Sequence, residues 1–136
     1  MTESIEPVER RRRQRFLARR RGEHCFWAQI EGARVALLDL SLEGFAMPAE
    51  ASPASGAAFA FVLERAGVPD QIRGRAHVVN RVGGAEGGQA GCLFDALDDD
   101  GRTRLEEWLT AHVLVNASVP ITEKDAAAIV TGPSLI

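Results

Sequence analysis

Residues 71–82 constrain the fold most, because polar and apolar side chains alternate along them. The residues expected to face inward are Ile72, Gly74, Ala76 and Val78, and those expected to face water are Arg73, Arg75 and His77. A period of two is that of a β-strand with one buried and one solvated face. A glycine-rich turn follows at residues 83–88, and a second apolar stretch follows at residues 90–95. The pattern predicts an antiparallel hairpin, and hence an antiparallel sheet.

Four shorter segments with strand-like composition precede this hairpin. They cover residues 25–30, 33–39, 44–47 and 57–64. Turn signals separate them: Glu31–Gly32, a Pro-, Ser- and Ala-rich loop at 48–56, and a hairpin connection at 66–70. Six short strands joined in this way are typical of a small barrel.

The period changes to that of a helix after residue 97. Leu105, Trp108, Leu109 and His112–Val113 recur at helical spacing. One of the three aspartates Asp98, Asp99 and Asp100 is expected to cap the helix, whose apolar stripe would cover one end of the barrel. A second, short helix is predicted from Thr122, with Asp125 three positions on as in a capping box. The predicted fold is mainly β: a small six-stranded antiparallel β-barrel with a C-terminal α-helix and a short C-terminal extension.

A chain of 136 residues suffices for a single hydrophobic core. We expect a disordered leader at 1–8, a barrel domain at 9–113 and an extension at 114–136. The acidic start is unlike a secretory signal, and no apolar run approaches the ~20 residues of a membrane helix. The chain is therefore expected to be cytoplasmic without membrane insertion, and its two cysteines, Cys25 and Cys92, to be buried and reduced.

The net charge of −3 conceals an uneven distribution. Residues 1–21 hold eight arginines against three glutamates, whereas residues 22–136 hold eight basic and sixteen acidic residues, so the two parts carry +5 and −8. A basic arm on an acidic body is expected to bind an external anion or to lie on the body's own acidic surface.

Two short segments carry the chemistry, the arginine run at 9–16 and Asp39–Gly44. Guanidinium groups hold phosphates in a fork and grip the O6 and N7 atoms of guanine. A carboxylate at Asp39 can accept from the N1–H and N2–H edge of guanine, and Ser41 lies on the same side of an extended chain. Gly44 would either take a positive φ or admit a ligand close to the backbone. Taken alone, Asp39–Ser41 could instead form an Asx or Ser turn, and the arginine run could be a solvated arm.

The order and spacing of these segments resemble the PilZ family of bacterial cyclic di-GMP receptors. That family carries an RxxxR motif in an N-terminal loop and a (D/N)xSxxG motif early in its barrel. Asp39, Ser41 and Gly44 match the second motif, and the resemblance covers about residues 9–112. RxxxR can be read as Arg11 with Arg15 or as Arg15 with Arg19. We favour the first reading, because Glu9–Arg11 precedes it and an aromatic residue follows it, as in family members.

The resemblance implies a cyclic di-GMP site made of Arg10, Arg11, Arg15, Asp39, Ser41 and Gly44. Arg10, just before the motif, implies a stacked pair of ligand molecules. The implied function is that of a non-catalytic adaptor in second-messenger signalling, of the kind that regulates motility or biofilm formation. The ligand would order the arginine segment onto the barrel and so alter a surface that an effector protein contacts.

The alternative function is a PilZ-like protein-interaction module that does not bind nucleotide. Nucleic-acid binding is disfavoured, because the body is acidic and aromatic residues are scarce. The three histidines lack metal-ligand spacing, and Asp98–Gly101 fits helix capping better than a calcium loop. No residue pattern points to catalysis, and no cofactor is expected.

Overall fold

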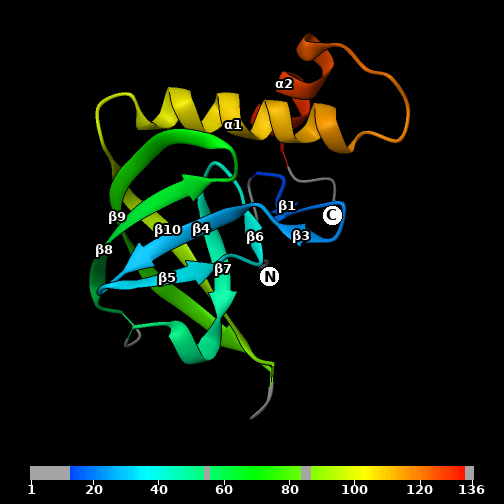
Figure 1. Cartoon of the computed structure of the whole chain (residues 1–136). Coiled ribbons are helices and arrows are strands. Elements are labelled where there is room, and N and C mark those ends of the chain that lie inside the picture. Colours follow the sequence, from blue (N-terminus) through cyan, green and yellow to red (C-terminus); the bar gives the residue numbers. More distant parts are fainter. Residues whose placement is uncertain (1–12, 54–55, 84–86, 134–136) are drawn as a thin grey trace, which may run out of the picture.

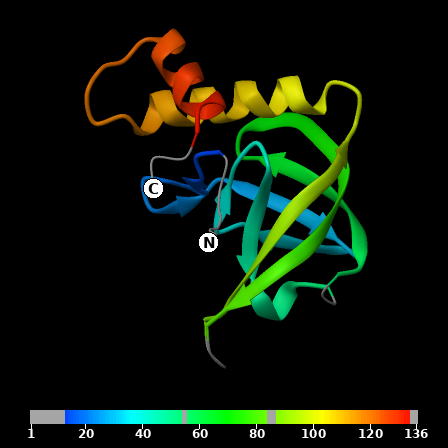
Figure 2. The ribbon, with the colours of Figure 1, turned by 180° about the vertical axis from the view of Figure 1, so that it is seen from behind.

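The structure is a computed structural model that describes residues 13–53, 56–83 and 87–133. An antiparallel sheet of eight strands, in the order β1-β6-β7-β10-β9-β8-β4-β5, curls around the core (Figures 1 and 2). A separate two-stranded ribbon pairs β2 with β3. The elements are β1 (Phe16–Leu17), β2 (Arg19–Arg20), β3 (Glu23–His24), β4 (Phe26–Ile30), β5 (Ala33–Ala36), β6 (Asp39–Leu40), β7 (Gly44–Pro48), the 3-10 turn η2 (Ala49–Ala51), β8 (Ala58–Arg65), β9 (Val68–Val82), β10 (Gln89–Leu97), α1 (Gly101–Asn116) and α2 (Glu123–Thr131).

The predicted mainly-β, antiparallel class is confirmed, but the count of six strands is wrong. The expected strand at 33–39 is divided into β5 and β6, because the chain changes partners between Leu37 and Leu38. The amide of Leu37 donates to Phe26 O (3.0 Å) in β4, whereas the amide of Leu38 donates to Ala46 O (2.8 Å) in β7. The segment therefore turns a corner of the sheet, and β1 adds a further strand by pairing with β6.

The basic stretch after Arg15 forms strands that the sequence pattern did not predict. Residues 19–24 make the hairpin β2–β3, whose two-residue turn consists of Arg21 (φ 55°) and Gly22 (φ 83°). Left-handed φ at both positions is typical of a type I′ turn. The Arg19 side chain donates from Nη1 to Gly22 O (2.9 Å), so this guanidinium stabilises the hairpin itself.

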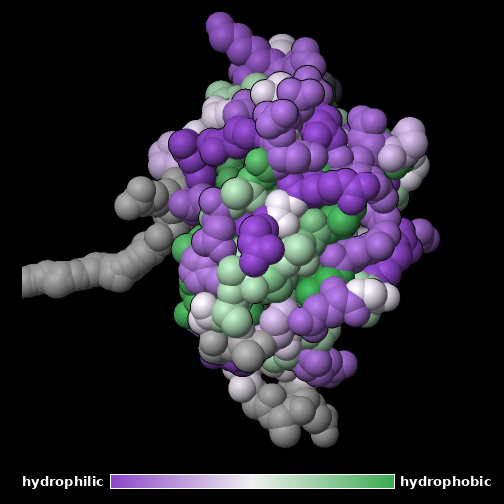
Figure 3. Space-filling view, turned by 90° about the vertical axis from the view of Figure 1, so that its left-hand side faces the viewer, coloured by the Kyte–Doolittle hydropathy of each residue, from purple (hydrophilic) through white to green (hydrophobic). Residues whose placement is uncertain are grey.

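The alternation that predicted the long strand is confirmed in β9. Ile72, Ala76 and Val78 are buried, whereas Arg73 and Arg75 are exposed. Figure 3 views the molecule from the left-hand side of Figure 1 and shows hydrophilic side chains interspersed among the apolar ones on this side. The inner face of the sheet supplies the core, and its outer face meets water.

Helix α1 lies across one end of the curled sheet, as predicted (Figure 1). Leu105, Trp108 and Leu109 are buried in the core, and Phe26 stacks on Trp108 with ring centroids 6.3 Å apart. Asp100 occupies the N-cap position, but its side chain makes no capping bond. One of the three expected aspartates therefore occupies the N-cap position, but the capping hydrogen bond is not made.

Helix α2 packs against α1. It begins with the predicted capping box, in which Thr122 Oγ1 accepts from the Asp125 amide (3.1 Å). The helix that the sequence pattern predicted from Thr122 is thereby confirmed. The expected leader at 1–8 lies outside the described residues.

Candidate functional site

Arg15 and Asp39, which stand 24 positions apart in the sequence, lie in contact. Arg15 Nε is 3.3 Å from Asp39 Oδ1, and the two side chains are 23% and 18% exposed. Pairing of β1 with β6 produces this contact, since Phe16 lies opposite Leu40 and Leu17 opposite Asp39. The sheet thus joins the two sequence segments at one place.

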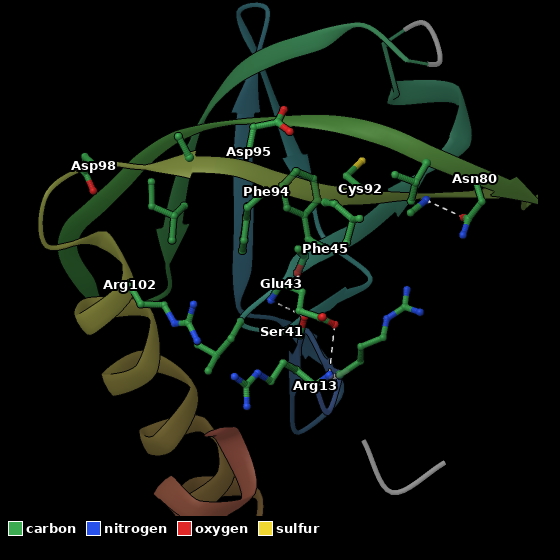
Figure 4. A pocket seen from close by; sticks show the side chains of 18 of the residues that line it. Arg13, Ser41, Glu43, Phe45, Asn80, Cys92, Phe94, Asp95, Asp98 and Arg102 are labelled. Atoms are coloured by element: carbon green, nitrogen blue, oxygen red, sulfur yellow. Dashed lines mark hydrogen bonds between the residues drawn. The ribbon is translucent and has the colours of Figure 1, made fainter. Parts of the chain in front are cut away.

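Residues 41–44 form a serine turn, which was one of the two interpretations open from the sequence. Ser41 is buried; its amide donates to Gly44 O (2.9 Å), and its Oγ accepts from the Glu43 amide (3.0 Å). This turn presents Glu43 beside Ser41 at the surface of the sheet (Figure 4).

Gly44 is required by the close approach of a neighbouring strand. A Cβ atom at this position would lie 1.9 Å from the carbonyl oxygen of Cys92 in β10. Gly44 is absent from the residues with positive φ in the described part of the chain, so its conformation does not demand glycine. The expected positive φ is therefore not found, and in the structure it is β10 of the same chain that approaches the Gly44 backbone closely.

An open groove of about 1660 Å³ runs from this turn along β10 to the start of α1. In Figure 4, Arg13, Ser41 and Glu43 lie at the lower centre, with Asp98 and Arg102 to the left and Asn80 to the right. The residues lining it are Arg13, Arg15, Ser41, Leu42, Glu43, Gly44, Phe45, Val79, Asn80, Gly91, Cys92, Leu93, Phe94, Asp95, Ala96, Leu97, Asp98, Asp99, Arg102 and Pro133. The groove offers cationic donors and carboxylate acceptors within one site.

The sequence pattern did not single out Arg13 or Glu43, yet both line the groove. The Arg13 amide donates to Glu43 Oε1 (3.2 Å), and the Arg13 guanidinium donates from Nη1 to the carbonyl of Thr131. Arg13 belongs to the predicted arginine run, and Glu43 lies inside the DxSxxG motif, so their neighbours in sequence were the available signal. Arg102, from α1, had no such signal.

Arg15 and Arg19, two arginines of the possible RxxxR pairs, lie in different places. Arg15, common to both, lines the groove. Arg19 lies in β2 and donates to the hairpin turn, and it is not among the groove residues. Arg11, like Arg10, lies outside the described residues.

A buried histidine of α1 contacts β1, the strand that follows Arg15. His112 Nε2 lies 2.8 Å from Leu17 O, and because a carbonyl only accepts, Nε2 carries the proton. Burial lowers the pKa of His112 below its usual value. The Cys25 Sγ lies 3.8 Å from Nδ1 on the other side of the ring. Two residues beyond Arg15, the chain is thus held to α1.

Two kinds of feature are not found in the described part of the chain. No three His, Cys, Asp or Glu side chains of that part are grouped where they could hold a metal ion. Likewise, none of its helices combines the length and apolar character needed to span a bilayer.

Comparison with known proteins adds two findings. The family model of the PilZ domain matches residues 9–111. The fold is similar to that of the Bacillus subtilis inhibitor of motility (MotI/DgrA), with a TM-score of 0.63 and 18% sequence identity. That match covers 81% of this chain and 54% of the other, so the chain spans about half the length of that protein. No curated protein sequence matches the chain significantly.

Proposed function

The chain belongs to the PilZ domain family, and on that premise we propose that it is a non-catalytic receptor for cyclic di-GMP. The observation that carries the proposal is the contact of Asp39 with Arg15, which lines an open groove. It unites the family's arginine segment with its DxSxxG segment.

The charges of the groove suit a nucleotide with two phosphates and two guanine bases. Arg13 and Arg15 offer guanidinium groups to phosphate oxygens or to guanine O6 and N7. Glu43, which lines the groove, and Asp39, which contacts Arg15 beside it, offer carboxylate acceptors to the N1–H and N2–H edge of guanine. The groove volume exceeds the roughly 300–1,000 Å³ of ordinary small-molecule pockets, which supports a ligand as large as a stacked pair.

Binding requires Arg15 to exchange one partner for another. The ligand phosphates replace the Asp39 carboxylate as the counter-charge of Arg15 and bring Arg10 and Arg11 to the ligand. The proposed site then consists of Arg10, Arg11, Arg15, Asp39, Ser41 and Gly44. An effector protein binds the surface that results.

Calorimetric titration of the full chain with cyclic di-GMP tests this function. Arg15→Ala and Asp39→Ala should each weaken binding about 10- to 100-fold, the value of one hydrogen bond to a charged group. Arg75→Ala and Asp70→Ala are matched controls, because both residues are exposed and neither lines the groove. They should bind as the wild type does.

The same titration measures stoichiometry, and a stacked pair predicts two ligands per chain. Absence of binding by the wild-type chain would refute the receptor function and favour the interaction module that binds no nucleotide. Binding that survives both Arg15→Ala and Asp39→Ala would place the ligand elsewhere.

A further inference from the structure

The C-terminal end of α2 lacks a cation of its own. No basic residue lies in its last turn, and Gly132 follows in an extended conformation (φ −81°) instead of the left-handed one that closes many helices. The Thr131 hydroxyl donates to Ala127 O (2.9 Å), one turn back along the helix, and not to one of the last carbonyls. These last carbonyls form the negative end of the helix dipole.

Arg13 supplies the missing cation from the other end of the chain. Its Nη1 donates to Thr131 O, while its amide donates to Glu43 Oε1 (3.2 Å) in the serine turn. The backbone of Arg13 is therefore held in the groove, and only its side chain reaches α2. Pro133, just after α2, also lines the groove, so the helix ends at the groove wall.

Helix α2 is suited to respond to the loss of such a contact. It has nine residues, fewer than the roughly 12–15 that an isolated helix needs to be stable in water. Its buried side chains are Ala126 and Val130. Its order therefore depends on docking against α1 and on its two ends.

We propose that Arg13 is a further ligand-binding residue and that α2 competes with the ligand for it. In the free protein the Arg13 guanidinium bonds the neutral carbonyl of Thr131. A phosphate oxygen is the stronger acceptor, because a charged acceptor makes a bond roughly twice as strong as a neutral one. The ligand therefore takes Arg13, and the last turn of α2 loses its counter-charge. This inference rests on the proposed function and adds that the order of α2 decreases when the ligand occupies the groove.

The first test uses the reciprocity of coupled equilibria. If ligand binding lowers the stability of docked α2, then undocking α2 must raise the affinity for the ligand by the same free energy. Ala126→Asp places a charge in the contact with α1 and should raise the affinity for cyclic di-GMP about two- to fivefold, the value of one helix-terminal charge contact. Ala128→Ser is the control, since Ala128 is exposed on the same helix and serine adds no charge at the negative end of the dipole. It should leave the affinity unchanged.

Hydrogen exchange on the full chain gives the second test, and the variants that it uses change no buried side chain. Cyclic di-GMP should increase exchange of the amides at 127–131 in the wild type. Arg13→Gln should show faster exchange there without ligand, bind more weakly, and show no further change when ligand is added. Arg21→Gln, in the exposed hairpin turn, is its control and should behave as the wild type does.

The outcomes separate the two proposals. Binding of cyclic di-GMP with unchanged or slower exchange in α2 would overturn the role of α2 and leave the receptor function intact. A chain that binds no cyclic di-GMP would overturn both.

Discussion

Substitution of Gly44 by alanine tests whether the motif glycine serves packing or the ligand. In the structure a Cβ atom at this position would lie 1.9 Å from Cys92 O, 2.9 Å from Cys92 C and 3.0 Å from Leu93 Cα. All three are backbone atoms of β10, which cannot rotate away as a side chain can. The strands β7 and β10 must therefore separate.

The geometry sets the size of the effect. Moving Cys92 O from 1.9 to about 3.0 Å, the shortest separation that real Cβ contacts show, requires an opening of about 1.1 Å. The bond from the Phe94 amide to Glu43 O (2.8 Å), next to Gly44, would be lost on such an opening, at a cost of about 1 kcal/mol. Overpacking strain adds about 1–3 kcal/mol. Gly44→Ala should thus lower the free energy of unfolding by about 2–4 kcal/mol.

Gly91→Ala is the comparison that makes this prediction sharp. Its Cβ would lie 2.7 Å from Asn80 Oδ1, the end of a side chain that can turn aside. The loss is the bond from the Gly91 amide to Asn80 Oδ1 (3.2 Å), which contributes about 1 kcal/mol. Urea unfolding of the wild type and both variants measures the difference. If Gly44→Ala proved no more destabilising than Gly91→Ala while cyclic di-GMP binding disappeared, the glycine would serve the ligand and the packing explanation would be wrong.

Three further predictions concern titratable groups. Burial lowers the pKa of His112 in the folded chain, so on acidification the imidazole of the unfolded chain is protonated first, and stability should fall as pH drops through about 6.5. Thermal unfolding should therefore give a lower melting temperature at pH 5.5 than at pH 7.5, and His112→Gln should reduce this difference. The Arg34 guanidinium lowers the pKa of Glu64, so the advantage of the wild type over Glu64→Gln in urea unfolding should be present at pH 7 and lost as pH falls through the acid range of carboxyl groups; an advantage that grew toward low pH would contradict this. Burial raises the pKa of Cys25, and that of Cys92 to about 11, so at pH 8 a disulfide reagent should label both thiols more slowly in the folded than in the urea-unfolded chain, and Cys92 by at least about a hundredfold.

Local patterns were sufficient to predict most of the elements. The period of two in β9 and the helical spacing of Leu105, Trp108 and Leu109 both report which side chains face the core, and burial confirms them. The capping box at Thr122 was predictable because its two hydrogen bonds join residues three apart. The hairpin at residues 19–24 was missed because its arginines are poor indicators of a strand and the turn geometry at Arg21–Gly22 is what closes it.

The site was predictable only in part. Arg15 and Asp39 stood out by residue type and motif spacing, but their contact depends on β1 pairing with β6. The role of Gly44 could not be read from the sequence, since it depends on how closely β10 passes. Arg102 entered the groove because α1 begins at its edge.

The sequence by itself determined the local elements and the two motif segments, because the period of hydrophobicity, turn chemistry and capping act between residues close along the chain. Tertiary structure alone decided which distant groups meet: Arg15 with Asp39, Arg13 with Thr131, and His112 with Leu17. Those pairs are separated by 24 to 118 positions, and nothing in a local pattern specifies the strand order and helix packing that bring them together. The groove and the contact of Arg13 with the end of α2 are therefore properties of the fold.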